Sequence, residues 1–266
     1  MNTPRVSDLS AVEAVPLGQP FAVFRGSKLL SMISLIVGPL GVFLIPGATI
    51  VGYVTGGVKE GSPAGPIMLV LSFLMALAGG YLIYAGLMMR QLRYELCPGG
   101  IARYKGQRVE VLPWNGLQIT VHFHGHPLLT ALGTSNKFWI KNDSRKWSVH
   151  YEVANSDKLA KAVSEEIVRR NLDPALERIT QGQPLEFGPI RVDRNGITLK
   201  DRTLSWEQVS SIGAAIEQRA SGVGRRFSIK QIGNDRDWGS VEERKVPNFE
   251  LLFALIRKLR PEALSP

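Results

Sequence analysis

The sequence of 266 residues contains one cysteine, Cys97. A single cysteine cannot form an internal disulfide, which argues against a disulfide-stabilised secreted domain and favours a reducing compartment. Acidic residues are also scarce, with 23 Asp and Glu against 32 Lys and Arg. The resulting formal charge of +9 indicates an anionic partner or surface, unless most of these charges are simply solvated.

Charged residues are nearly missing from residues 29–89, where only Lys59 and Glu60 occur. The two apolar runs beside this pair, residues 29–58 and 67–89, each exceed the roughly 20 residues that a helix needs to cross a bilayer. They predict a transmembrane helical hairpin with a short turn rich in Gly and Pro. A signal peptide is the competing interpretation of the first run, but that run lies behind 28 residues and is too long for it.

Basic residues flank the predicted hairpin on its open side. Arg25 and Lys28 precede the first run and Arg90 and Arg93 follow the second, whereas the turn carries only Lys59. Because basic residues near helix ends favour the cytoplasmic side, both termini are expected to be cytoplasmic in an integral protein of the cell membrane.

Ionisable residues do not occur inside either apolar run, although small residues such as Gly38, Gly79 and Gly86 do. Small residues allow helices to pack closely, whereas a transport site normally has an ionisable side chain that faces a cavity. The pattern therefore favours helix packing over a broken helix at a transport site.

The soluble part reads as short strands and amphipathic helices. Strand patterns follow residue 90, and residues 156–170 then change to a helical period, with Leu159, Val163 and Ile167 on one face. Pro174 is expected to kink or end this helix. A shorter series of strands then leads to a final helix at residues 248–260.

These patterns predict a membrane-anchored α+β chain, in which a transmembrane helical hairpin is followed by two antiparallel sheet-plus-helix units. The expected divisions are an amino-terminal cytoplasmic segment at 1–28, the hairpin at 29–89, a first unit at 90–182 and a second, shorter unit at 183–266.

A tryptophan motif occurs twice in the soluble part. Residues 99–119, "GGIARYKGQRVEVLPWNGLQI", and residues 195–212, "NGITLKDRTLSWEQVSSI", both lead from Gly-Ile through a strand to a Trp with an aliphatic residue three positions later. Trp114 and Trp206 are expected to be buried core residues that cover a sheet end, with Leu117 and Val209 directed to the core and the indole N–H bonded to a carbonyl or water. An aromatic ligand platform is the less favoured alternative. The duplication itself indicates two tandem units.

A shorter match, "LGQPFAVF" at residues 17–24 and "QGQPLEFG" at residues 181–188, precedes each motif. In the first unit the hairpin separates this segment from its continuation. Either the hairpin is inserted after an opening strand of the first sheet, with Phe21 or Val23 close to residues 92–96, or the amino-terminal stretch is only a polar lead-in with a chance match.

Taken together, "LGQPFAVF", the hairpin, both tryptophan motifs and "KVPNFELLFALIRKL" resemble a family of uncharacterised membrane proteins. The resemblance runs from Leu17 to Leu259, with Gly196, Trp206 and the Pro247-Asn248 helix start as its sharpest elements. It implies soluble domains similar to bacterial pleckstrin-homology-like domains. It implies no activity, because that fold serves many unrelated binding roles.

Residues that could carry chemistry form no recognisable catalytic pattern. His122, His124 and His126 alternate along one predicted strand and His150 could join them, but the spacing matches no established zinc motif. Cys97 has no companion His or Asp in a recognisable order, and "ASGVGRRF" reads as an ordinary loop rather than a phosphate cradle. We therefore expect no enzyme activity, no cofactor and no metal.

The basic residues nearest the hairpin are the best candidates for contact with anionic lipid headgroups, and we favour lipid over nucleic acid as the anionic partner. These candidates are Arg90, Arg93, Arg103, Lys105 and Arg108. The expected function is that of a membrane-anchored cytoplasmic binding or scaffold module for a protein or lipid headgroup. The alternative is an oligomeric transport or channel element regulated by its soluble modules.

Overall fold

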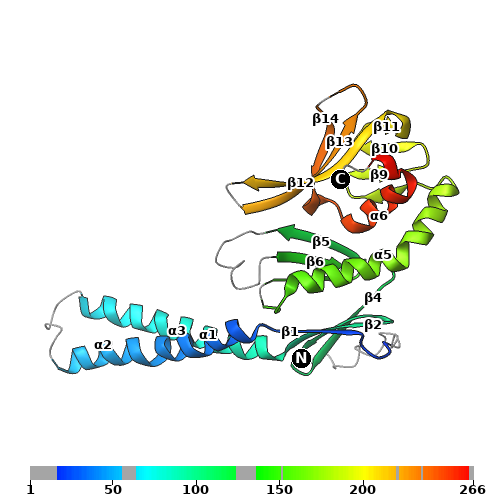
Figure 1. Ribbon diagram of the computed structural model, residues 1–266. Helices are drawn as coiled ribbons and strands as arrows, with labels where there is room; N and C mark the ends of the chain where they lie inside the picture. Colours follow the sequence, from blue (N-terminus) through cyan, green and yellow to red (C-terminus); the bar gives the residue numbers. More distant parts are fainter. Residues whose placement is uncertain are drawn as a thin grey trace, which may run out of the picture.

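The computed structural model describes residues 17–55, 64–123, 136–150, 152–219, 222–234 and 236–263. The chain is an α+β protein with four antiparallel sheets. Figure 1 shows a long helical hairpin that projects sideways from a stack of sheets and helices.

The first arm of the hairpin consists of α1 (Lys28–Pro39), a π-helical turn (Leu40–Leu44) and α2 (Ile45–Val54), and the second arm is α3 (Ala64–Gln91). Two helices, Lys28–Gly52 and Pro66–Gln91, are long and apolar enough to cross a membrane. Large apolar side chains on both arms are exposed, for example Phe43 at 71% and Tyr81 at 69%. No other part of the described residues covers these side chains.

Close packing joins the two arms, as the small residues predict. A Cβ atom on Gly79 would lie 2.5 Å from the carbonyl oxygen of Gly38, so the helices can approach this closely only without a side chain there. Hydroxyl groups contribute as well: Ser31 donates to the carbonyl oxygen of Gly86 at 2.8 Å. Such contacts are typical of packed helices in a low-polarity surrounding.

The first sheet–helix unit contains a four-stranded sheet of order β1-β2-β3-β4 and a three-stranded sheet of order β5-β6-β7. Helix α5 follows the second sheet. The bounds are β1 (Ala22–Arg25), β2 (Leu92–Cys97), β3 (Gly100–Lys105), β4 (Arg108–Pro113), β5 (Gln118–Phe123), β6 (Asn136–Lys141), β7 (Lys146–Val149) and α5 (Ser156–Thr180).

Strand β1 pairs antiparallel with β2 across the hairpin. Of the two alternatives that the sequence left open, the structure therefore has the hairpin inserted after an opening strand. The predicted side-chain direction is wrong by one residue. Phe21 and Val23 are 54% and 45% exposed, whereas Ala22 and Phe24 pack against the core. Because side chains alternate along a strand, a shift of one residue exchanges the two faces.

The second unit repeats the same plan, with a sheet of order β8-β9-β10-β11, a sheet of order β12-β13-β14 and helix α6. Its first sheet has shorter strands than that of the first unit, its helix is shorter, and no hairpin interrupts its first two strands. The bounds are β8 (Leu185–Phe187), β9 (Ile190–Val192), β10 (Gly196–Leu199), β11 (Arg202–Ser205), β12 (Val209–Arg219), β13 (Gly222–Gln231), β14 (Asp237–Glu242) and α6 (Phe249–Leu259).

Helix α5 does not end at Pro174 but continues through it to Thr180. The last turns change direction where the helix reaches the second unit, as Figure 1 shows. A proline inside a helix removes one backbone hydrogen bond and bends the axis, so the kink is the half of the prediction that holds.

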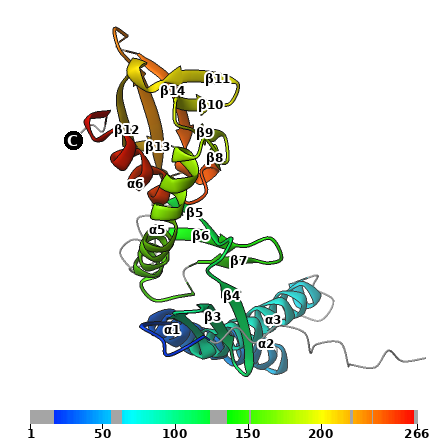
Figure 2. The same cartoon turned by 90° about the vertical axis from the view of Figure 1, so that its right-hand side faces the viewer.

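A continuous core runs through both units. Leu159 and Val163 of α5 and Leu252 and Ile256 of α6 are each 0% exposed. Figure 2 shows the hairpin at one end of the stack and the second unit at the other, so that the stack extends across the direction of the hairpin rather than along it.

Candidate functional site

Trp114 follows the last residue of β4 and is 5% exposed. Its indole N–H donates a hydrogen bond to the carbonyl oxygen of Cys97 at 2.8 Å. The N–H of Leu117 returns to the carbonyl oxygen of Trp114 at 3.2 Å, which closes the predicted turn. The burial of Trp114 and the carbonyl partner of its N–H are therefore confirmed.

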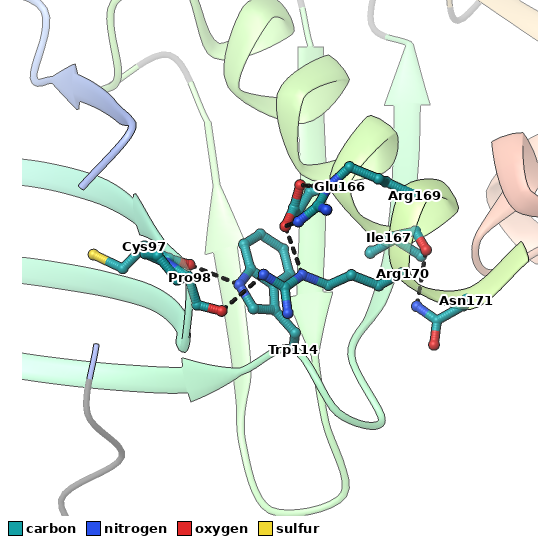
Figure 3. Close-up of polar contacts among 8 residues, drawn as sticks. All are labelled: Cys97, Pro98, Trp114, Glu166, Ile167, Arg169, Arg170 and Asn171. Atoms are coloured by element: carbon teal, nitrogen blue, oxygen red, sulfur yellow. Dashed lines mark hydrogen bonds and ion pairs between the residues drawn. The ribbon is translucent and has the colours of Figure 1, made fainter. Parts of the chain in front are cut away.

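Arg170 of α5 covers the face of this indole, as Figure 3 shows. Its guanidinium carbon lies 5.3 Å from the ring centroid, and the same group donates to the carbonyl oxygen of Pro98 at 2.8 Å. Glu166 pairs with Arg170 and Arg169, and the hydrogen bond from Arg169 lowers the pKa of Glu166 despite its burial. These contacts hold α5 against the first sheet. Because Arg170 covers the indole face, a ligand could not stack on it there.

Trp206 occupies the equivalent place in the second unit. It is 6% exposed, and its indole N–H donates to the carbonyl oxygen of Asp193 at 3.0 Å. The N–H of Val209 returns to the carbonyl oxygen of Trp206. The predicted burial beside Val209 is confirmed, so both indoles are buried and donate to backbone carbonyl groups.

Of the five basic candidates for membrane contact, Arg103 and Arg93 pair with acidic side chains and the other three are exposed. Arg103 is bonded to Glu110, lies over the Trp147 ring at 4.7 Å and is only 12% exposed. Arg93 is 42% exposed and contacts Glu95 at 3.2 Å. Arg103 is thus committed to the first unit, whereas Arg93 retains part of its surface.

Arg90, Lys105 and Arg108 are exposed at the end of the hairpin. The turn between β3 and β4 lies against α3, because a Cβ atom on Gly106 would be 2.7 Å from the side-chain oxygen of Gln91. The structure therefore brings these three cations to the place where the hairpin meets the first sheet.

Histidines do not assemble a metal centre in the described part of the chain. His122 packs edge-on against Trp139 at 4.1 Å, and His150 forms a 2.6 Å hydrogen bond with Ser148. His124 and His126 lie outside the described residues. Within the described ranges, no group of three His, Cys, Asp or Glu side chains could hold a metal ion.

Cys97 is buried, and this burial, with a contribution from Glu95, raises the pKa of its thiol. A raised pKa keeps the thiol protonated and unreactive, which agrees with the lack of a nucleophile pattern around it.

Asn248 joins the second unit to the first. The backbone N–H of Asn248 donates to the carbonyl oxygen of Ile119 at 2.8 Å, and the Ile119 N–H donates to Oδ1 of Asn248 at 2.8 Å. Nδ2 of Asn248 also donates to the carbonyl oxygen of Leu117 at 3.2 Å. The residue therefore pairs with β5, in addition to preceding the final helix as the sequence predicted.

A cavity of about 550 Å³ lies between the two units beside this junction. Helices α5 and α6 contribute most of its lining, and β5, β13 and the 3-10 turn Glu243–Lys245 contribute the rest. The lining combines apolar side chains with acidic and basic ones. The apolar members are Ile119, Val121, Ala160, Val168, Phe249, Phe253 and Ala254.

Glu243 is the most buried charged group of this cavity, with a side chain only 5% exposed. Its Oε1 lies 3.4 Å from Nη1 of Arg225, and that nitrogen lies 3.4 Å from Oε1 of Glu250. Its Oε2 is buried and has no hydrogen-bond partner among the described residues. Burial raises the pKa of Glu243 to about 7; Arg225 opposes the increase and Glu250 adds to it.

The sequence did not single out Glu243, because the acidic and basic residues around it read as a solvated charge run. The available signal was a short match before the two helices, Val153-Ala154-Asn155 and Val246-Pro247-Asn248. The N–H of Val153 donates to the carbonyl of His150 and that of Val246 to the carbonyl of Glu243, and both valines are 0% exposed. When the two helix starts are aligned, Glu243 is the counterpart of His150. Each residue lies three positions before the buried valine that connects the sheet to the helix.

The structure defines an α+β protein of two similar sheet–helix units with an apolar helical hairpin between the first two strands. The chain belongs to a family of unknown function (DUF6585), whose sequence model matches residues 1–263. Searches of curated proteins and of solved structures give no match.

Proposed function

We propose that this chain is a membrane-anchored binding module, in which the hairpin crosses the cell membrane and two pleckstrin-homology-like units bind a protein or lipid headgroup at the cytoplasmic face. The observation that carries the proposal is the exposed apolar surface of both hairpin arms, which ends at a group of exposed cations. A lipid bilayer provides both an apolar interior for the arms and anionic headgroups for the cations.

The pleckstrin-homology-like assignment rests on the shared plan of the two units. Each has a four-stranded and a three-stranded antiparallel sheet followed by a helix that packs on the core. Folds of this kind present sheet edges and loops for binding and need no catalytic group.

The basic end of the hairpin supplies the headgroup contact. Arg90, Lys105 and Arg108 form it, with Arg93 at its margin, and each basic residue near an anionic surface contributes about 1 kcal/mol. Arg103 is left out because Glu110 already neutralises it. Since the stack extends across the hairpin direction (Figures 1 and 2), a hairpin that crosses the bilayer would hold the soluble part alongside the membrane surface.

A polarity-sensitive dye on Gln107→Cys tests this contact, since Gln107 lies in the exposed β3–β4 turn and Cys97 is buried. In nanodiscs with anionic lipid, the dye emission should shift to the blue and return at high salt. A dye on Asp201→Cys, in the equivalent turn of the second unit, should not respond. Equal responses at the two positions, or none in either, would contradict the proposed contact surface.

The side of the membrane is tested separately by cysteine labelling in intact cells. Lys59→Cys should react with an impermeant reagent from outside, and Asn195→Cys should react only after permeabilisation. The reverse pattern would place both termini outside and reject the cytoplasmic assignment.

A further inference from the structure

The cavity between α5 and α6 shares no residue with the basic end of the hairpin, and its chemistry does not depend on a membrane. We propose that this cavity binds a small neutral molecule with an apolar body and a hydroxyl group, and that the hydroxyl group bonds to Glu243.

The walls favour an apolar body. Ile119 and Val121 line the cavity from β5, and Phe249 and Phe253 line it from α6, with their ring centroids 4.8 Å apart. The volume of about 550 Å³ lies within the range of about 300–1,000 Å³ that is usual for small-molecule sites.

Glu243 requires a polar partner. A buried carboxyl oxygen without a hydrogen bond is costly. Arg225 pairs with Oε1 of Glu243, and Oε2 has no hydrogen-bond partner among the described residues. An ionised carboxylate needs a donor, whereas a protonated carboxyl group also needs an acceptor. Because the pKa of Glu243 is about 7, both forms are populated at neutral pH. A hydroxyl group satisfies either form, since it both donates and accepts.

The charges around the cavity disfavour a charged ligand. The lining contains four acidic and four basic side chains, so it carries little net charge to attract either sign. An ammonium group on Glu243 would face Arg225, and a carboxylate on Arg225 would face Glu243 and Glu250. A neutral polar group avoids both repulsions.

Three water-soluble probes with one aryl body distinguish these possibilities: 2-phenylethanol, the phenethylammonium ion and phenylacetate. The full-length protein in nanodiscs of uncharged lipid is labelled at the isoleucine methyl groups, and Ile119 in the cavity wall is the reporter. 2-Phenylethanol should shift the Ile119 methyl resonance in a saturable way. The two charged probes should bind at least tenfold more weakly.

Variants locate the binding and identify the group responsible. Ala254→Trp should fill the cavity and abolish the shift, whereas Lys258→Trp, at an exposed position of α6, should leave it intact. Glu243→Leu should weaken binding at least tenfold. Glu243→Gln should stay within threefold of the wild type, because an amide also donates and accepts.

Three results would overturn the proposal. A lack of saturable binding by any probe would mean that the cavity holds only water. Tighter binding of a charged probe would reject the neutral class of ligand. Equal affinity in the folded Glu243→Leu variant would remove Glu243 from the site; if that variant does not fold, an unchanged affinity in Ala254→Trp would reject the cavity itself.

Discussion

The two sheet–helix units differ most between their first two strands. In the first unit the hairpin connects Arg25 to Leu92, whereas in the second unit Gly188 and Pro189 alone connect Phe187 to Ile190. The same four-stranded sheet forms in both cases. Strand pairing thus tolerates either connection, as expected when loop-closure entropy grows slowly with length and the inserted segment folds on its own.

The units also differ where their helices begin. Asn155 and Asn248 both adopt left-handed backbone conformations, at φ 56° and 53°. Three residues before the buried valine that precedes each helix, the units carry different side chains. In the first unit this residue is His150, which bonds to Ser148. In the second it is Glu243, which is buried and has one oxygen without a hydrogen-bond partner among the described residues. The duplicated backbone has been kept, and the side chains at these positions have diverged.

The largest expected effect comes from the residues that the units share. Trp114→Ala and Trp206→Ala should each lower the free energy of unfolding by about 3–5 kcal/mol, because each removes a buried indole. Trp114→Ala should cost at least as much as Trp206→Ala, since Arg170 also loses its stacking partner. Denaturant unfolding in detergent, followed by near-ultraviolet circular dichroism, measures both.

Trp139→Ala is the control for these two substitutions, because Trp139 is only partly buried and lies outside both motifs. We expect a loss of about 1 kcal/mol. A similarly small loss for Trp206→Ala would mean that Trp206 does not support the second unit.

The next prediction concerns Glu243, where the units diverge. Its pKa is about 7 in the folded protein and 4.5 as the ordinary value. Because the folded protein binds this proton more tightly than the unfolded chain, protonation of Glu243 stabilises the fold. This contribution is complete below pH 4.5 and is lost as the pH rises through about 7. The loss should be on the order of 3 kcal/mol, at 1.36 kcal/mol per pKa unit.

Glu243→Gln should remove this part of the pH dependence of unfolding. The groups that face Glu243 are Arg225 of β13 and Glu250 of α6, with Asp157 and Lys161 of α5 also lining the cavity. Glu165→Gln, on the exposed rim, is the control and should leave the pH profile unchanged. Identical pH profiles for the wild type and Glu243→Gln would show that Glu243 has an ordinary pKa.

A smaller effect is expected at the glycines that open each tryptophan motif. A Cβ atom on Gly100 would lie 2.4 Å from the carbonyl oxygen of Leu112, and one on Gly196 would lie 2.2 Å from that of Leu204. Gly100→Ala and Gly196→Ala should each cost about 1–3 kcal/mol, because the strands must separate. Gly213→Ala, with nothing within 4 Å, should change stability by about 0.5 kcal/mol or less. Unequal costs at Gly100 and Gly196 would weaken the equivalence of the motifs.

Sequence alone predicted the features that local patterns encode. The hairpin followed from the lack of charge over residues 29–89, and the tandem units followed from the duplicated Trp114 and Trp206 motifs. The repeated Gly-Gln-Pro indicated the opening strand β1 as one of two equal alternatives, and the pairing with β2 decided between them. In each case the physical requirement, such as apolar length or a buried ring at a sheet end, acts on neighbouring residues.

The register of β1 could not be predicted. Aligned letter by letter, Phe21 corresponds to Leu185, but Ala22 pairs with Leu96 and Leu185 pairs with Val192. The first unit therefore has one more residue between its proline and its first inward side chain. Only the pairing partner decides which face of the strand is buried.

The cavity and the junction between units were also beyond sequence reasoning. Asn248 and Ile119 are 129 residues apart, and Glu243 lines one cavity with α5 side chains only because the two units pack together. Such contacts depend on how the two units pack against each other, and the spacing of apolar residues along the sequence carries no information about this packing.

The smallest predicted effect separates the two asparagines that begin the helices. Glycine tolerates a left-handed backbone as well as asparagine does, so Asn155→Gly and Asn248→Gly remove only the side chains. Asn155 makes no capping hydrogen bond, and its substitution should be nearly neutral. Asn248→Gly should cost about 1–2 kcal/mol, because it removes the side-chain hydrogen bonds with Ile119 and Leu117 and leaves the Ile119 N–H without its partner.

Hydrogen exchange measures the difference between the two asparagines at one atom. Asn248→Gly should accelerate exchange of the Ile119 amide while amides in the sheet of β12, β13 and β14 keep their protection, because the substitution loosens the junction and not the second unit. Asn155→Gly should leave the Ile119 amide unchanged. If both substitutions accelerate its exchange equally, Asn248 acts only as a helix start like Asn155, and the join between the units depends on the apolar packing of α5 against α6 instead.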